Sequence, residues 1–365
     1  MSQEKADLIV KNASQLLTLR SHKKGPRLGP QMEDLGLVCD GAVASGGGLI
    51  LAAGSSAAVE TGFVPGPEAE VIDAQGKVVT PGFVDAHTHP VFAGSREEEF
   101  ELRIKGSSYQ EIAAAGGGIR ASVRSLHQAT EEQLEREARP RLDRMLSLGT
   151  TTAEAKSGYG LSLAAEIKSL EVIARLNKSH PIELIPTFLG AHEVPEEFQQ
   201  DRGEYIRQIQ EEMIPQVVQR GLAEFCDIFC EQGVFDVEES REILSTAKRA
   251  GLKLKLHADE LAASGGALLA AELEAVSADH LVFVSPAGID AMRKAGVIPV
   301  LLPGTTFSYP VTIRLPAELP DGDYRLLVGV YLWPAVERLP VLADVPGAEI
   351  RAVELRQVRV VLNRR

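Results

Sequence analysis

The sequence predicts an α/β protein: a (β/α)₈ barrel of the TIM type with seven recognisable βα units and the eighth missing, preceded by a small β-sandwich-like domain. Two patterns lead to this fold class. Between residues 78 and 304, apolar segments alternate with charged amphipathic segments of roughly 10 to 20 residues, which is typical of parallel sheets. Before residue 80, short apolar runs are separated by Gly-rich turns and lack helical periodicity, which indicates β-structure.

The N-terminal part, residues 1–80, is therefore expected to form the small β domain. Strands are predicted at residues 7–19, 41–54 and 69–80, where apolar residues alternate with polar ones or run together.

The barrel is expected to occupy residues 81–309. Its strands are predicted in seven segments: 78–89, 149–158, 182–192, 225–233, 251–260, 277–283 and 297–304. Amphipathic helices are predicted between them, at residues 131–148, 163–178 and 237–251. Seven strand–helix units correspond to an eight-unit barrel that is one strand short.

The last segment, residues 310–365, departs from this alternation. It is interrupted by prolines and Asp-Gly turns, and it contains Val- and Leu-rich runs. These features predict antiparallel strands and hairpins, and thus an atypical β-rich tail rather than a further βα unit.

Composition excludes several classes of protein. The 365 residues include 51 acidic and 38 basic side chains, a formal net charge of −13, which argues against a nucleic-acid or anionic-membrane partner. No apolar run approaches the roughly 18 residues that span a bilayer, and the first residues do not read as a secretory signal. The three cysteines, Cys39, Cys226 and Cys230, form no CxxC pair, so a disulfide framework is not expected. The predicted location is the cytoplasm, with Cys226 and Cys230 buried in a strand.

Histidines at strand ends predict a metal site. His87 and His89 lie two residues apart at the end of an apolar strand, so their side chains point to one face and can bind one ion. His192, His257 and His280 each follow or end a later strand candidate. Since ligands collect at the carboxyl ends of barrel strands, we expect these five imidazoles to converge. The remaining histidines, His22, His127 and His180, are expected to be solvated.

Two charged residues fit hydrolytic chemistry. Glu260 follows His257 by three residues and can exchange protons with a water molecule there. Arg96 follows His89 by seven residues and can bind a carboxylate in bidentate fashion. Taken alone, either residue is ordinarily a surface charge, and Tyr159 is ordinarily a core or loop aromatic. The glycines Gly116, Gly117 and Gly118 lack the GK[ST] ending of a phosphate loop.

Together these motifs resemble the imidazolonepropionase family of histidine degradation, within the amidohydrolase superfamily. The resemblance covers residues 1–309 and rests on stretches in family order: TPGFVDAHTHPVFAGSR, AAAGGGIRASV, LGTTTAEAKSGYGL, PTFLGAHEVP, FCDIFCEQGVF, LKLHADELA, ADHL and VIPVLLPGTTF.

The resemblance implies a metal-dependent cyclic amide hydrolase that converts 4-imidazolone-5-propanoate to N-formimidoyl-L-glutamate. One zinc or iron ion would be held by His87, His89 and His257. Glu260 would act as general acid and base and also contact the substrate, and His280 would position the attacking water. Arg96 would bind the substrate carboxylate, with Tyr159 and His192 against the ring. These implied site residues all lie within the matching stretches.

The resemblance ends near residue 309. The family continues with an eighth strand that ends in a metal-ligating Asp, and then with a chain that completes the small β domain; residues 310–365 match neither. Asp321, Asp323 and Asp344 lie outside any family motif and are assigned no role.

Two alternatives stay open. One is another amidohydrolase, such as a deaminase of a cyclic purine or pyrimidine. The other is a non-catalytic product of truncation or fusion that only binds metal. For an imidazolonepropionase and for another amidohydrolase alike, the expected partner is a small-molecule substrate. The family resemblance also suggests a homodimer.

Overall fold

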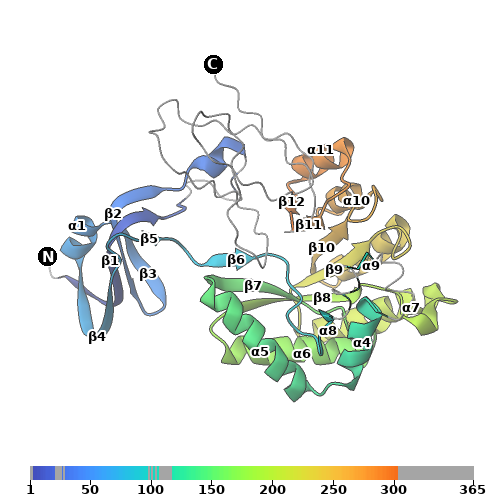
Figure 1. Cartoon of the computed structure of the whole chain (residues 1–365). Helices are drawn as coiled ribbons and strands as arrows, with labels where there is room; N and C mark the ends of the chain where they lie inside the picture. Colours follow the sequence, from blue (N-terminus) through green and yellow to red (C-terminus); the bar gives the residue numbers. More distant parts are fainter. Residues whose placement is uncertain are drawn as a thin grey trace. The chain divides into compact units, whose positions relative to one another are not determined.

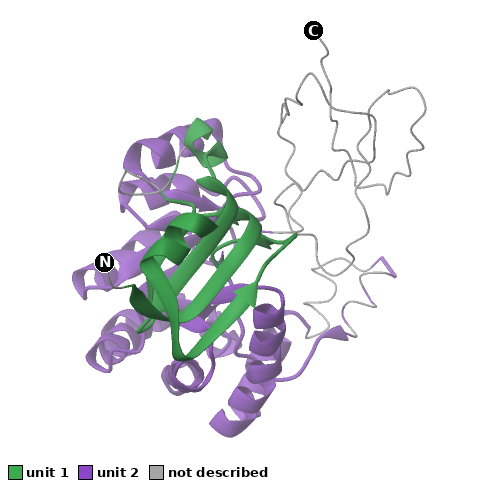
Figure 2. Cartoon of the chain, turned by 90° about the vertical axis from the view of Figure 1, so that its left-hand side faces the viewer, with its two compact units in different colours: residues 1–83 green, residues 84–365 purple. Residues whose placement is uncertain are grey.

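The computed structural model describes residues 3–20, 27, 29–97, 99, 102, 105–106 and 117–302. The chain divides into two compact units, residues 1–83 and 84–365 (Figure 2). The sequence prediction places a domain boundary at residue 80. The predicted tail, residues 310–365, lies outside the described residues, as do His22 and Gly116.

The first unit contains a mixed five-stranded sheet with the order β3-β2-β1-β4, and β5 pairs with β1. Its strands are β1 (Glu4–Leu17), β2 (Leu37–Gly46), β3 (Leu49–Ser55), β4 (Phe63–Asp73) and β5 (Val78–Val79). β2 is antiparallel to β1 and β3, whereas β4 and β5 run parallel to β1. Gly47 and Gly48 connect β2 to β3 with φ of +58° and +78°, as a tight hairpin turn requires. The described residues of this unit thus form a single mixed sheet; the β-structure expected for the N-terminal part is present, and the sandwich-like arrangement stays a prediction.

A short helix, α1 (Ser56–Gly62), packs on this sheet. Ser55 caps it by accepting a hydrogen bond from Ala58 N, and Val59 is buried among Ala6, Ile9 and neighbouring alanines of β2. A 3₁₀ turn, η1 (Gly29–Glu33), has no buried residue.

The second unit is built on a seven-stranded sheet with the order β12-β11-β10-β9-β8-β7-β6. Its strands are β6 (Phe83–Asp85), β7 (Thr150–Lys156), β8 (Glu183–Ala191), β9 (Phe225–Cys230), β10 (Lys253–Ala258), β11 (Ser277–His280) and β12 (Ile298–Val300). The pairs from β7 to β12 are all parallel, and spatial order follows chain order. The predicted curled parallel sheet of seven strands is confirmed.

The first predicted barrel strand, residues 78–89, is interrupted in the structure. β5 ends at Val79 and β6 begins at Phe83, with Pro81 and Gly82 between them. Proline has no N–H group to donate to a sheet, so a break at this point is the expected consequence of its presence.

Helices connect the strands and cover the convex side of the curved sheet (Figure 1). They are α4 (Ile119–Gln128), α5 (Glu131–Ser147), α6 (Leu163–Ser179), η2 (Glu196–Phe198), α7 (Arg202–Gln208), η3 (Ile209–Met213), α8 (Ile214–Gln219), α9 (Val237–Arg249), α10 (Gly266–Glu272) and α11 (Pro286–Ala295). The three predicted helices correspond to α5, α6 and α9. Asp236 and Glu239 form a capping box at the start of α9.

One prediction about this unit is wrong. His180 was expected in solvent, but it is buried at the end of α6, where the chain turns into β8. Its Nε2 lies 3.1 Å from Asp143 Oδ1, and its Nδ1 accepts a hydrogen bond of 3.1 Å from Ile182 N. Both ring nitrogens therefore have partners that replace water. His127 is exposed, as expected.

The core between helices and sheet supports a stability prediction. Leu142 of α5 is fully buried, whereas Leu148, just after the same helix, is 49% exposed. We expect Leu142→Ala to lower the free energy of unfolding by about 2–5 kcal/mol, because it removes apolar contacts and leaves a cavity. Leu148→Ala should change it by about 0.5 kcal/mol or less. Urea unfolding of both variants would measure this, and equal losses would contradict the packing described.

Candidate functional site

Five imidazoles meet at the carboxyl ends of the parallel strands. His87 and His89 follow β6, His192 follows β8, and His257 and His280 lie in β10 and β11. The ring centroids of His87 and His257 are 4.6 Å apart, and those of His89 and His192 are 5.1 Å apart with nearly parallel planes. The structure thus brings together all five strand-end histidines that the sequence singles out.

Their nitrogen atoms can hold a cation. Among the described residues, ligand atoms within 4.8 Å of one another occur in three groups. Two consist of histidines and share His257: His87–His257–His280 and His89–His192–His257; the third is His87–Glu154–Asp279. The Nδ1 atoms of His89 and His280 are buried and have no hydrogen-bond partner among the described residues. Burial lowers the pKa of His89 and His257 well below the usual value, so both rings are neutral at pH 7. Neutral imidazole is the form that binds metals, and the cluster therefore suits a divalent metal ion.

Two buried carboxylates lie behind these rings. His87 Nδ1 donates to Asp279 Oδ2 over 2.6 Å, and His257 Nδ1 lies 2.9 Å from Asp227 Oδ2. A carboxylate on one ring nitrogen fixes the orientation of the imidazole and leaves the other nitrogen available to a metal.

A fully buried lysine holds the carboxylates in place. Lys156 Nζ lies 2.6 Å from Asp227 Oδ2, 3.0 Å from Glu154 Oε1 and 3.4 Å from Asp279 Oδ2. Lys255 Nζ adds contacts of 2.7 Å to Glu154 Oε2 and 3.0 Å to the carbonyl oxygen of Ala86. Burial alone would lower the pKa of Lys156, but the surrounding carboxylates raise it above its usual value. The lysine is therefore charged.

Sequence reasoning missed this network of Glu154, Lys156, Asp227, Lys255 and Asp279. The sequence does contain a signal for it: Lys255 and His257 lie two residues apart in KLKLH, and Glu154 and Lys156 lie two residues apart in AEAK, each pair with an apolar residue between them. Residues two apart in a strand share a face, so Lys255 points to the same side as His257, and Glu154 to the same side as Lys156. Asp279 directly precedes His280.

Glu260 lies on the loop after β10, where its Oε2 is 3.4 Å from His280 Nε2. Buried Glu231 holds this loop by accepting hydrogen bonds from Glu260 N (2.9 Å) and Leu261 N (2.8 Å). Burial, and then the nearby charge of Glu231, raise the pKa of Glu260 to about 7. A carboxyl group with this pKa can both take up and release a proton at neutral pH.

Tyr159 and His192 line another side of the cluster. The Tyr159 ring centroid is 5.5 Å from those of His89 and His192. His192 Nδ1 donates to the carbonyl oxygen of Gly158 over 2.9 Å. Burial lowers the pKa of His192 to about 4, so this ring is also neutral.

Arg96 is the predicted residue that the structure does not join to the cluster. Its side chain is 41% exposed, and its Nε lies 3.4 Å from Glu99 Oε2. Among the described residues, Glu99 is thus the ion-pair partner of the Arg96 guanidinium.

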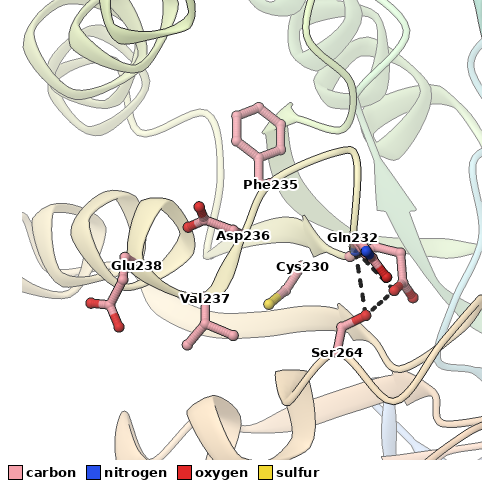
Figure 3. A pocket seen from close by; sticks show the side chains of 8 residues that line it. Cys230, Gln232, Phe235, Asp236, Val237, Glu238 and Ser264 are labelled. Atoms are coloured by element: carbon pink, nitrogen blue, oxygen red, sulfur yellow. Dashed lines mark hydrogen bonds between the residues drawn. The ribbon is translucent and has the colours of Figure 1, made fainter.

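A separate pocket lies beside the loop that carries Glu260 (Figure 3). Its lining residues are Cys230, Glu231, Gln232, Phe235, Asp236, Val237, Glu238 and Ser264. Gln232 N donates to Glu231 Oε1 and to Ser264 Oγ over 2.9 and 3.3 Å (Figure 3). No histidine of the cluster lines this pocket, so it is distinct from the metal-binding groups.

The model of the Amidohydrolase family matches residues 70–123. An imidazolonepropionase from Alkaliphilus metalliredigens is 49% identical over 302 residues, which cover 83% of this chain and 71% of that protein. An imidazolonepropionase from Geobacillus kaustophilus is 51% identical over 301 residues, which cover 82% and 71%.

Solved structures support the fold. An adenosine deaminase from Xanthomonas campestris with bound zinc superposes with a TM-score of 0.52 at 19% identity, covering 84% of this chain and 66% of that one. A 5-methylcytosine deaminase from Klebsiella pneumoniae gives a TM-score of 0.55 at 16% identity, covering 81% and 65%. Among the described helices, none has the length and apolar character needed to cross a bilayer.

The buried lysine leads to a stability prediction. Lys156→Met leaves Asp227 and Asp279 without their main cation, and breaking a buried ion pair from one side costs roughly 3–5 kcal/mol. Lys253→Met is the matched control. Lys253 is the first residue of β10, away from His257, and its side chain is 61% exposed, so its pairing with Glu224 is worth about 1 kcal/mol or less. The free energy of unfolding at pH 7 would separate the two variants. Similar losses would show that the Lys156 network does not stabilise the fold.

The carboxyl group of Glu260 leads to a titration prediction. In ¹³C NMR we expect the chemical shift of the Glu260 carboxyl carbon to change with an inflection at about pH 7, because this group is neutral below that pH and ionised above it. The inflection should be absent in Glu260→Gln. Glu231→Gln should move it to lower pH, because a neighbouring negative charge is removed while an acceptor oxygen is kept. Glu224→Gln is the control, since Glu224 precedes β9 whereas Glu231 follows it. An inflection that Glu231→Gln leaves in place would contradict this coupling.

Proposed function

Since the chain belongs to the imidazolonepropionase family of amidohydrolases, we propose that it hydrolyses 4-imidazolone-5-propanoate to N-formimidoyl-L-glutamate in histidine degradation. The observation that carries the proposal is the convergence of five imidazoles with Glu260 at the carboxyl ends of the strands. The match to curated imidazolonepropionases at about 50% identity supports the choice of a small cyclic amide as substrate.

One metal ion, zinc or iron, belongs to this proposal, with His87, His89 and His257 as its protein ligands. Imidazole nitrogens suit both metals. When bound, such an ion acts as a Lewis acid and makes water a stronger acid. The pairing of His87 with Asp279 and of His257 with Asp227 supports these two residues as ligands, because each presents its free nitrogen away from a carboxylate.

In the proposed reaction Glu260 transfers the protons, and His280 orients the water. The Glu260 carboxylate takes a proton from the attacking water, whose oxygen bonds to the ring carbonyl carbon. The bond from this carbon to the ring nitrogen then breaks, and Glu260 returns the proton to that nitrogen. Burial lowers the pKa of His280 to about 4, so its neutral ring can orient water next to Glu260 without competing for the proton.

Tyr159, His192, Glu260 and Arg96 bind the substrate in this proposal. Tyr159 and His192 contact the ring and its carbonyl, from the side of the cluster where both rings lie. Arg96 exchanges its exposed pairing with Glu99 for the propanoate carboxylate, a bidentate partner that a guanidinium prefers. We also propose a cytoplasmic location and a homodimer, and the domain limits at residues 80 and 309 stay predictions.

A substrate assay combined with metal analysis tests the function. We expect the purified chain to hydrolyse imidazolone propanoate and to carry about one metal ion per chain, as for a single three-ligand site. His257→Ala should lose both the metal and turnover. His180→Gln, which replaces a buried histidine outside the cluster, should keep both.

Other results would select the alternatives. Turnover of cytosine or guanine instead of the imidazolone would indicate a deaminase. Bound metal without any turnover would indicate a protein that only binds metal. Turnover that is lost in Asp321→Asn or Asp323→Asn would give the tail a role in the site.

A further inference from the structure

Glu166 is a wholly buried carboxylate that the proposed chemistry does not use. It lies in the first turn of α6, which starts at Leu163 after Ser162. Its side chain reaches back over the start of the helix to the loop of residues 157–161, which joins β7 to α6. A buried carboxylate is costly unless its oxygens accept hydrogen bonds, so its partners indicate its role.

Backbone amides of this loop converge on Glu166. Its Oε1 accepts from Gly160 N (2.7 Å), Leu161 N (2.9 Å) and Gly158 N (3.2 Å), and its Oε2 lies 3.0 Å from Gly158 N. All three donors precede α6, and none belongs to the helix itself. The carboxylate therefore organises the loop rather than the helix.

The loop has a conformation that needs such support. Gly158 has a φ of +105° and Leu161 a φ of +50°, and the left-handed region is unfavourable for a leucine. Gly160 lies so close to α6 that a Cβ there would be 2.5 Å from Glu166 N. The hydrogen bonds that these three backbone N–H groups donate to one carboxylate offset the cost of this tight, partly left-handed path.

Through this loop, Glu166 acts on the substrate side of the cluster. Tyr159 lies between two of the bonded amides. The Gly158 carbonyl can only accept, so the 2.9 Å hydrogen bond from His192 fixes the proton of that ring on Nδ1 and leaves Nε2 unprotonated. A Cβ at Gly158 would be 2.9 Å from His192 Nδ1, so loop and ring are also in direct steric contact.

We propose that Glu166 is a positioning residue for substrate binding: by holding the 157–161 loop, it sets the place of Tyr159 and the tautomer of His192. The inference rests on the proposed function, because that function gives Tyr159 and His192 their contacts with the substrate ring. Glu166 itself touches neither the substrate nor the metal ligands in this assignment.

Three substitutions separate this role from a general effect on folding. Glu166→Ala removes every contact of this side chain with the loop. Glu166→Asp shortens the side chain so that it reaches fewer amides, and Glu166→Gln keeps the Oε1 acceptor. Asn177→Ala is the matched control. Asn177 lies on the same helix and bonds the backbone of Leu184 through both side-chain atoms (2.9 and 3.0 Å), away from the loop.

We expect Glu166→Ala to raise KM for imidazolone propanoate by about tenfold or more, the loss of one well-made contact, with a smaller change in kcat and unchanged metal content. Glu166→Asp should lie between Glu166→Ala and the native chain. Glu166→Gln and Asn177→Ala should have nearly native KM values. If Glu166→Ala does not fold, the Asp and Gln pair carries the same comparison.

A second readout does not depend on turnover. In ¹⁵N-histidine NMR of the metal-loaded chain, with the His192 signals assigned by their loss in His192→Gln, we expect the Nδ1–H tautomer in the native chain and in Glu166→Gln. Glu166→Ala or Glu166→Asp should show a mixture of tautomers.

A native KM and an unchanged His192 tautomer in Glu166→Ala and Glu166→Asp would overturn the inference, as would an equal KM increase in Asn177→Ala. If the native chain does not hydrolyse the substrate, the proposed function fails, whereas the tautomer measurement still decides whether Glu166 positions His192.

Discussion

The interaction on which the second unit depends is the enclosure of the Lys156 ammonium group by three carboxylates. Glu154, Asp227 and Asp279 come from β7, β9 and β11, and none of these charges has access to water. Charges removed from water are tolerated only when they are paired. The curved sheet brings the inner faces of these strands together, so each buried charge has a partner, and the ion pairs lie directly behind the histidine cluster.

The network also determines what the imidazoles can do. Asp227 and Asp279 occupy one nitrogen of His257 and of His87, so the free nitrogens of both rings face the cation site. Burial keeps the His257 ring neutral, and at the edge of the cluster it raises the pKa of Glu260 to about 7. Burial therefore leaves neutral histidines in the centre of the cluster and, at its edge, a carboxyl group that can exchange protons near pH 7.

Local sequence patterns were sufficient for strands β7 to β12, for helices α5, α6 and α9, and for the convergence of five histidines, because periodicity and strand-end position are properties of short segments. They were not sufficient for Lys156 and Asp279, because a charged residue in a strand ordinarily faces solvent and its buried partner lies far along the chain. His180 was mistaken for a solvated residue for the same reason. Glu166 and Glu231 were also missed, since a glutamate that accepts backbone N–H groups has no motif of its own.

The separation of the paired groups along the chain has a consequence for folding. Lys156 and Asp227 are 71 residues apart and His87 and Asp279 are 192 apart, whereas each strand of the sheet pairs with its neighbour in sequence. Closing long loops costs more entropy than joining adjacent strands, so sheet pairing can proceed before the ion pairs form. Until β11 docks, Lys156 lacks Asp279, one of its three carboxylate partners. We therefore expect the ion pairs behind the histidine cluster to form late in folding, after the strands that carry them have paired.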